Sequence, residues 1–203
     1  MAHGFVYSLS GRLYDFLDNS AEMTRYASIR EEIIPKLFGK VLDAGCGTGR
    51  NFPYYPSNAE VTAVDSHHKM LEVARRRKSQ SKASITLKKH NLNKLPFKDN
   101  TFDAVVATFV LCVNTKEEAS LILHELTRVA KTGARLYFLE YVYPQTPIKK
   151  LYTTMTALFP FFLYGLRYNI TKPLLEKHPS LTIEEKKLVY KDSVRLLVAR
   201  KTA

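Results

Sequence analysis

The sequence predicts an α/β fold, in which a mostly parallel sheet carries helices on both faces. From residue 40 onward, short apolar runs alternate with segments of helical periodicity, as in proteins built from repeated strand–helix units. Two of these runs, AVVAT at 104–108 and RLYFLE at 135–140, are apolar almost throughout. Strands of a parallel sheet show this pattern because helices bury both of their faces. A glycine-rich loop directly after the first run is the third sign of such a fold.

Each element follows from its local pattern and its boundary residues. A first helix is expected over 20–36, because Ser20 can cap its start and Pro35 and Gly39 close it. The other predicted helices start around Asn51 or cover 69–77 and 116–129, and a turn is expected at Gly133. The predicted strands are 40–44, 60–64, 84–89, 102–108, 135–140, 185–190 and 193–200. The last two form an antiparallel hairpin, because the short turn between them allows no crossover.

Length and composition indicate one domain over 1–203, since 203 residues are enough to bury a core. Within it we expect an N-terminal helical cap over 1–36 and an aromatic and basic lid over 141–180. The two cysteines, Cys46 and Cys112, fall in stretches that should be buried, and their spacing suggests neither a zinc site nor a redox pair. Reduced thiols of a cytosolic protein fit best.

The net charge of +12 and the pI of about 9.6 favour anionic partners, such as nucleic acid, acidic lipid surfaces or anionic substrates. The alternative is a lysine-rich surface that only keeps the protein in solution. Neither a secretory signal nor a run of about 18 uninterrupted apolar residues is found in the sequence. We therefore expect a cytoplasmic protein.

The stretch VLDAGCGTGRN runs from an apolar strand into Asp43 and then places Gly45, Gly47 and Gly49 at alternate positions. Glycines so spaced let the backbone turn tightly and approach a ligand closely. The dinucleotide fingerprint G-x-G-x-x-G fails, because Arg50 stands third after Gly47. An acidic residue at the loop entrance also suits an ammonium group better than a pyrophosphate. The alternative is a turn with a purely structural role.

Asp43 and the three glycines resemble the first motif, D/E-x-G-x-G-x-G, of the class I S-adenosylmethionine-dependent methyltransferases (type 11 group). Phe102-Asp103 and the stretch ELTRVAKTG at 125–133 resemble two further motifs of that family, although Thr132 and Ala134 replace the usual proline and second glycine. The resemblance runs from about Tyr14 to Glu140. It implies a Rossmann-like, seven-stranded sheet with an antiparallel last strand, and S-adenosyl-L-methionine as cofactor.

The resemblance also assigns residues to the cofactor. Asp65, which ends the second strand, would bind the ribose hydroxyls, although it could also be a helix cap. Asn91 stands where the family usually has an aspartate that receives the adenine amino group, and an amide oxygen can still accept that hydrogen bond. The full set of cofactor-binding residues that we expect is Tyr14, Asp43, Gly45, Cys46, Gly47, Gly49, Asp65, Ser66, Met70, Asn91, Leu92 and Thr108. Met70 could equally be core packing.

The methyl acceptor is less closely specified. The segments GTGRNFPYYP, TFVLCV and YFLEYV resemble membrane-associated thiol methyltransferases, and the first also resembles bacterial phosphatidylethanolamine N-methyltransferases. The quinone C-methyltransferases share only the general motifs. All of these act on hydrophobic substrates. The lid at 141–180 interleaves aromatic and basic residues, which suits an anionic membrane surface, or it packs on the sheet and seals the site.

For catalysis, Tyr14 and Tyr26 are candidates as hydrogen-bond acceptors or cation–π partners of a substrate ammonium, and Glu140 as a carboxylate at the end of the fifth strand. All three could be structural, and no metal site is expected. The leading prediction is methyl transfer to the amine headgroup of phosphatidylethanolamine by a monomer on the membrane surface. The alternatives are a thiol or quinone acceptor, an RNA acceptor, and a cofactor-binding module without activity. The RNA alternative is weakened because the sequence lacks the catalytic motif usual in RNA methyltransferases.

Overall fold

The structure is a computed structural model that describes residues 26–143, 146–147, 170–190 and 193–202. Most of the expected N-terminal cap, including Tyr14 and Ser20, lies outside the described residues. Most of the expected lid at 141–180 lies outside them too. The glycine-rich loop and the five strands predicted between residues 40 and 140 all lie within the described ranges.

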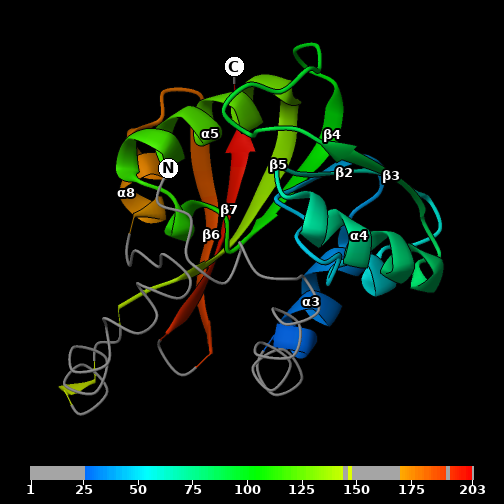
Figure 1. The fold of residues 1–203 in the computed structure, drawn as a ribbon. Coiled ribbons are helices and arrows are strands. Elements are labelled where there is room, and N and C mark those ends of the chain that lie inside the picture. The colour runs from blue at the N-terminus through cyan, green and yellow to red at the C-terminus, as the bar shows by residue number, and fades with distance from the viewer. Residues whose placement is uncertain (1–25, 144–145, 148–169, 191–192, 203) are drawn as a thin grey trace.

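A seven-stranded sheet with the strand order β3-β2-β1-β4-β5-β7-β6 forms the centre of the molecule (Figure 1). Its strands are β1 (Gly39–Ala44), β2 (Ala59–Asp65), β3 (Ser84–Lys89), β4 (Phe102–Thr108), β5 (Ala130–Tyr141), β6 (Leu181–Tyr190) and β7 (Val194–Lys201). The first five pair in parallel, and β7 pairs antiparallel with both β5 and β6. The predicted α/β sheet with a reversed last strand is confirmed.

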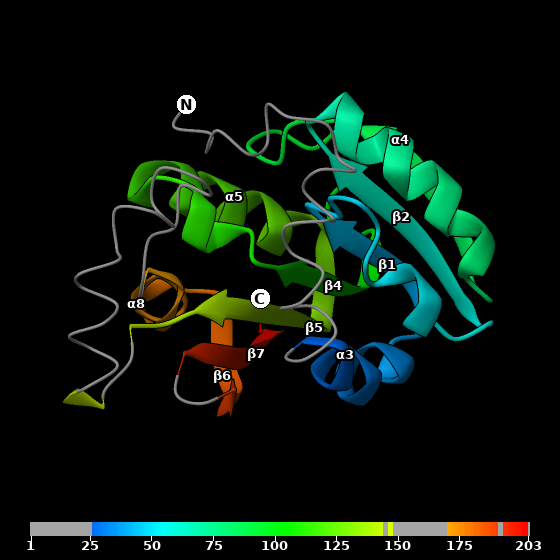
Figure 2. The ribbon, with the colours of Figure 1, turned by 60° about the horizontal axis from the view of Figure 1, so that its bottom comes forward.

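Helices cover both faces of the sheet (Figure 2). They are α3 (Ala27–Ile33), α4 (His68–Arg77), α5 (Lys116–Val129) and α8 (Thr171–Lys177), with short 3-10 turns at Ile34–Lys36, Phe52–Tyr54, Lys78–Gln80 and Leu111–Val113. Successive strand residues point to opposite faces, so Leu42 packs in the core under α5 and α8, while Val41 packs in the core under α4. A third apolar cluster joins α3 to β5 and β7.

The α-helix expected from about Asn51 is absent from this described stretch, and a single 3-10 turn, Phe52–Tyr54, stands in its place. Pro56 explains the difference, because a residue that precedes proline is pushed out of the helical region. Tyr55 accordingly has an extended backbone with ψ of 133°. No α-helix within this described stretch therefore directs its N-terminal amides into the glycine loop.

The turn expected at Gly133 is also wrong, because β5 runs without a break from Ala130 to Tyr141. The pairing register between β4 and β5 shifts in this region, between Phe102 and Ala104 on β4. Gly133 has a φ of 83°, which a glycine adopts readily, so the strand absorbs the irregularity as a bulge. The hairpin of the last two strands is confirmed, and its turn at 191–192 lies outside the described residues.

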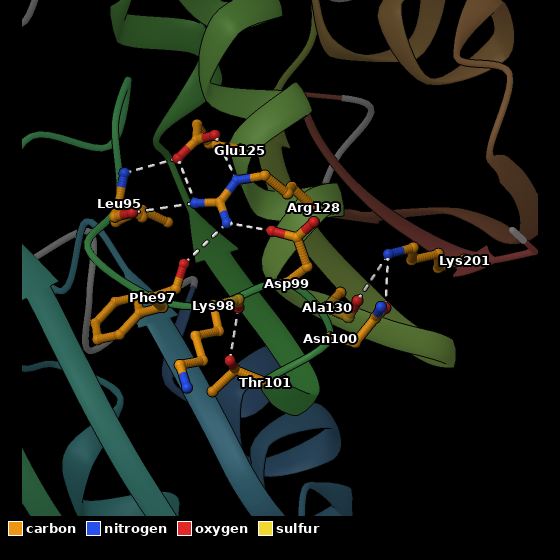
Figure 3. A network of polar contacts seen from close by, with 10 residues as sticks. All are labelled: Leu95, Phe97, Lys98, Asp99, Asn100, Thr101, Glu125, Arg128, Ala130 and Lys201. Atoms are coloured by element: carbon orange, nitrogen blue, oxygen red, sulfur yellow. Dashed lines mark hydrogen bonds and ion pairs between the residues drawn. The ribbon is translucent and has the colours of Figure 1, made fainter.

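A guanidinium clamp joins α5 to the segment that leads into β4 (Figure 3). Arg128 donates to both carboxylate oxygens of Glu125, to the Asp99 carboxylate, and to the backbone carbonyls of Leu95 and Phe97, at 2.6 to 3.0 Å. Glu125 in turn accepts the backbone N–H of Leu95 at 2.7 Å. The E-x-x-R pair of the sequence motif is thus a structural device that fixes this segment on the helix.

A buried carboxylate ties the end of β5 to the turn after β4. Glu140 is 1% exposed and accepts the backbone N–H groups of Val110, Leu111 and Cys112 at 2.9 to 3.3 Å. Burial raises the pKa of Glu140 to about 7, against the opposing effect of its hydrogen bonds with Cys112 and these amides. Glu140 therefore anchors the turn after β4 to the end of β5.

Replacing Arg128 by Met should destabilise the fold by about 2–4 kcal/mol, because it leaves the carboxylate of Glu125 and two backbone carbonyls without their donor. Urea unfolding followed by circular dichroism measures the change. Arg75→Met is the matched control, since Arg75 is an exposed residue of α4, and it should shift stability by less than about 0.5 kcal/mol. Equal effects of the two substitutions would contradict the clamp.

Replacing Glu140 by Gln should remove a pH dependence of stability. Because the pKa of Glu140 rises from 4.5 to about 7 on folding, the folded state holds the proton more tightly than the unfolded state. This stabilisation is complete below pH 4.5 and is lost as the pH rises through about 7. Over that window the free energy of unfolding should fall by about 3 kcal/mol relative to Glu140→Gln. A difference that changes in the opposite direction in urea titrations would show that Glu140 is ionised in the fold.

Candidate functional site

A cavity of about 370 Å³ opens at the carboxyl ends of β1, β2 and β4. The strand order reverses between β1 and β4, and open α/β sheets bind ligands at this switch point. The cavity is lined by Arg30, Gly45, Cys46, Gly47, Thr48, Arg50, Asn51, Asp65, Ser66, His67, Met70, Asn91, Leu92, Asn93, Thr108, Phe109, Val110, Val113, Asn114, Glu118 and Ile122. Its size and its mixture of apolar and polar walls suit a small-molecule ligand.

The three positions of the loop require glycine for different physical reasons. A Cβ at Gly45 would lie 2.6 Å from the Val110 side chain, and one at Gly49 would lie 2.6 Å from the Phe52 ring, so packing excludes larger residues there. Gly47 has a φ of 54°, and its Cβ position is open space at the cavity wall. Its bare backbone therefore leaves room for a ligand to approach closely. Gly49 itself is not among the lining residues.

Asp65 lies at the end of β2 and holds the glycine loop. Its two carboxylate oxygens accept the backbone N–H of Gly47 at 2.9 Å and the backbone N–H of His67 at 2.8 Å. The His67 ring nitrogen Nδ1 lies 3.4 Å from the same carboxylate. A carboxylate has more acceptor sites than these bonds use, so Asp65 can also accept two ligand hydroxyls.

The loop after β3 and the start of α4 form the next part of the wall. Met70 and Leu92 are buried apolar residues of the lining, so Met70 serves both the core and the cavity. The Asn91 side-chain oxygen accepts the backbone N–H of Asn93 at 3.0 Å. The predicted adenine acceptor therefore also shapes its own loop.

A buried polar chain, unforeseen from the sequence, runs behind the loop. Arg30 of α3 is 5% exposed, lines the cavity, and donates to the Asn51 side-chain oxygen and, at 3.4 Å, to the Thr108 hydroxyl. The Asn51 amide nitrogen donates to both oxygens of Asp43, at 3.1 and 3.2 Å. The only sequence signal for Arg30 is a charged residue on the apolar helix face formed with Ile33.

Asp43 is fully buried and is not among the lining residues, so it acts on the cavity through Asn51. Burial raises the pKa of Asp43 to about 6, while the neighbouring Tyr55, Asn51 and Arg30 oppose the rise. The acidic residue of the motif therefore orients an amide and, through it, a buried guanidinium. Direct contact between the Asp43 carboxylate and a ligand would require the hydrogen bonds between Asp43, Asn51 and Arg30 to rearrange.

Tyr26 lies behind the cavity wall. It is 2% exposed, its ring centroid lies 4.8 Å from that of Phe109, and its hydroxyl is 2.6 Å from the hydroxyl of Tyr141. Phe109 lines the cavity and has an unusual φ of 58° for a non-glycine residue. Tyr26 thus supports a lining residue and does not itself line the cavity.

The cavity brings together Gly45, Cys46, Gly47, Asp65, Ser66, Met70, Asn91, Leu92 and Thr108 from the predicted set. Asp43, Gly49, Tyr26 and Glu140 lie outside its lining, and Tyr14 lies outside the described residues. Both cysteines are free and buried, as expected. Within the described ranges, no three His, Cys, Asp or Glu side chains are grouped to hold a metal ion, and no helix is long and apolar enough to span a membrane.

Comparison with known proteins gives the family. Residues 42–138 match the model of a family described as "Methyltransferase domain". The ubiquinone/menaquinone biosynthesis C-methyltransferase of Desulfotalea psychrophila is 34% identical over 83% of this chain and 65% of its own length. The demethylmenaquinone methyltransferase of Staphylococcus saprophyticus is 32% identical over 80% of this chain and 72% of its own length.

A phosphatidylethanolamine N-methyltransferase of Cereibacter sphaeroides is 34% identical, but over 48% of each chain. The chain thus spans between about half and two thirds of the length of several curated relatives.

Among solved structures, the magnesium protoporphyrin IX methyltransferase of Synechocystis PCC 6803, solved with bound SAH, superposes with a TM-score of 0.64. The match covers 91% of this chain and 83% of that one at 22% identity, which shows a shared fold. The strand order, the glycine loop and these relatives lead to one conclusion. The chain belongs to the S-adenosylmethionine-dependent methyltransferases of class I.

Proposed function

We propose that this protein transfers the methyl group of S-adenosylmethionine to a lipid-like or hydrophobic acceptor, first of all the amine headgroup of phosphatidylethanolamine. The observation that carries the proposal is the division of the cavity into two kinds of wall. The glycine loop and Asp65 make one side polar. Phe109, Val110, Val113 and Ile122 make the other side mainly apolar, and its polar residues are Thr108, Asn114 and Glu118.

The polar side fits the proposed cofactor. The open Cβ position at Gly47 provides a cradle for a ligand, and the Asp65 carboxylate next to it can accept the two ribose hydroxyls. Ser66 and Met70 would frame the adenine, while Asn91 and the backbone of Leu92 would meet its polar edge. The cavity volume of about 370 Å³ is in the range of small-molecule sites.

Arg30 would meet the carboxylate of the amino-acid part of the cofactor. A guanidinium is always charged, and that of Arg30 lies at the cavity wall, where it donates to Asn51 and Thr108. A buried cation is costly unless an anion compensates it. The Asp43 carboxylate, which is linked to Arg30 through the Asn51 side chain, is one such anion, and the carboxylate of a bound cofactor would be another.

When bound, the cofactor supplies a methyl group activated on a sulfonium. The chain's own residues then have to hold the acceptor in line and exclude water, and positioning of this kind can lower a barrier by several kcal/mol. An amine acceptor must also lose a proton. Glu118 is the carboxylate on the apolar side, and its oxygen already accepts the Thr115 backbone N–H at 3.2 Å. We propose Glu118, with Tyr14, as the group nearest the acceptor ammonium.

A quinone precursor is the second candidate acceptor, because the relatives that match over most of this chain carry quinone methyltransferase names. A hydrophobic thiol is a third class, because a human thiol S-methyltransferase is 33% identical over 58% of this chain and 48% of its own length. An amine is placed first because Glu118 puts a negative charge at the apolar wall, which favours a cationic headgroup over a neutral ring.

The proposal includes contact with an anionic membrane surface, since a lipid-like acceptor has to be taken from one. The net charge of +12 and the aromatic, basic segment at 141–180 support it. The location that we propose is peripheral to the membrane on the cytoplasmic side. The same proposal includes a single domain over 1–203, with the cap at 1–36 and the lid at 141–180. It does not include nucleic acid as a partner.

Replacing Asp65 by Asn should weaken binding of S-adenosylmethionine by about 10- to 100-fold, because hydrogen bonds to a charged acceptor contribute about 1.5–3 kcal/mol. Isothermal titration calorimetry measures the dissociation constant. The matched control is Glu72→Gln, which removes an exposed carboxylate from α4 and should leave the affinity unchanged. An Asp65→Asn protein that is less stable yet binds the cofactor normally would support the helix-cap alternative.

Three acceptors are offered with labelled S-adenosylmethionine: phosphatidylethanolamine vesicles, a demethylated quinone and a long-chain thiol. The protein should methylate the phospholipid fastest. Glu118→Gln should lower that rate about tenfold or more without changing cofactor affinity, since Gln preserves the capping hydrogen bond but not the charge. Glu117→Gln, at the neighbouring exposed position, is the control. Transfer to the quinone alone would replace the phospholipid as acceptor.

A further inference from the structure

The positive charge of this protein is concentrated in one part of the chain. Between Asp65 and Asp99, ten Lys and Arg residues stand against a single acidic residue, Glu72. This stretch therefore carries a net +9 of the total of +12, although it is about a sixth of the sequence. A lysine-rich surface that served solubility alone would have no reason to gather its charge in this way.

The stretch folds into α4, the following 3-10 turn and β3, which is the edge strand of the sheet (Figures 1 and 2). Five exposed cations lie between the end of α4 and the end of β3: Arg75, Arg76, Lys78, Lys82 and Lys89. We call these five residues the basic face. Arg75 and Arg76 end α4, Lys78 follows directly, and Lys82 and Lys89 lie just before and at the end of β3.

The cations of the basic face have no ion-pair partner among the described residues. Elsewhere, Arg128 pairs with Asp99, Lys131 with Asp103 and Arg135 with Glu184, at 2.5 to 2.7 Å. Within the described residues, none of the five side chains of the basic face lies within salt-bridge distance of a carboxylate. The charge of this face is thus available to an external anion.

The same two elements also form part of the cavity. Met70, on the inner side of α4, lines the cavity, and so do Ser66 before the helix and Asn91 after β3. A partner that docked along the outer side of α4 and β3 would therefore lie beside the wall of the site, which suits a partner that carries the acceptor.

We propose that the basic face docks on an anionic lipid bilayer and so brings the site to a membrane-borne acceptor, an inference that rests on the proposed function. Each Lys or Arg near an anionic bilayer contributes about 1 kcal/mol of attraction. The stretch 66–89 contains no Phe, Tyr or Trp, so it offers no aromatic ring for stacking nucleic-acid bases. Lipid phosphates and carboxylates need only the charge.

The test is sedimentation of the full chain with phosphatidylcholine vesicles that contain 30% or no phosphatidylserine, which needs no turnover. The variant Arg75→Gln/Arg76→Gln/Lys78→Gln should bind the anionic vesicles about a hundredfold more weakly, given about 1 kcal/mol for each charge. The control Lys36→Gln/Lys116→Gln/Lys177→Gln removes the same charge from exposed positions elsewhere and should weaken binding by less than about threefold. Raising the salt to about 0.5 M should release the native protein.

Equal loss in the two triple variants, or no binding to anionic vesicles at low salt, would overturn the proposal. Tighter binding of an RNA duplex than of vesicles, lost in the basic-face variant only, would assign the face to nucleic acid. Cofactor affinity, measured by calorimetry, should be the same in all three proteins and shows that the variants are folded. Methyl transfer to a short-chain, micelle-free acceptor tests the proposed function separately, so either proposal can fail while the other stands.

Discussion

Three backbone N–H groups of the glycine loop donate to the end of β2, and these hydrogen bonds determine the geometry of the whole site. The N–H groups of Gly45 and Cys46 donate to the Val64 carbonyl at 2.8 and 3.0 Å, and that of Gly47 donates to Asp65. They turn the chain away from β1 just where the strand order reverses. The cavity, its bare backbone wall and its carboxylate all result from this turn, because any side chain at Gly45 or Gly49 would collide with Val110 or Phe52.

Two buried carboxylates support this geometry without facing the cavity. Glu140 holds the turn after β4 through three backbone amides, and Asp43 holds Asn51 and, through it, Arg30. Burying a carboxylate is unfavourable unless hydrogen bonds compensate it, which is why each accepts several donors and why burial raises the pKa of both. The residues that line the cavity are thus positioned by polar groups one layer behind them.

The outer surface divides in a similar way. Arg128 of α5 and Lys131 and Arg135 of β5 are engaged in ion pairs, whereas the five cations of the basic face have none with the described residues. An edge strand that carries exposed charge, here Lys89, resists pairing with other strands, so the basic face also protects the open side of the sheet. Protection from aggregation and attraction to an anionic surface are compatible, since both depend on the same exposed charge.

Local patterns in the sequence are enough for the strands, the longer helices, the reversed last hairpin and the glycine loop, because apolar periodicity and short turns act over a few residues. The place of Asp65 at the cavity could be predicted from its position at a strand end, and those of Met70 and Asn91 from the family resemblance. The roles of Arg30, Asn51 and Glu140 could not be predicted in this way, since their hydrogen-bond partners lie 78, 8 and 30 residues away in the sequence. The missing helix after the loop follows from Pro56, and the gathering of charge is already present in the stretch 66–98, but only the strand order places that stretch at an edge of the sheet.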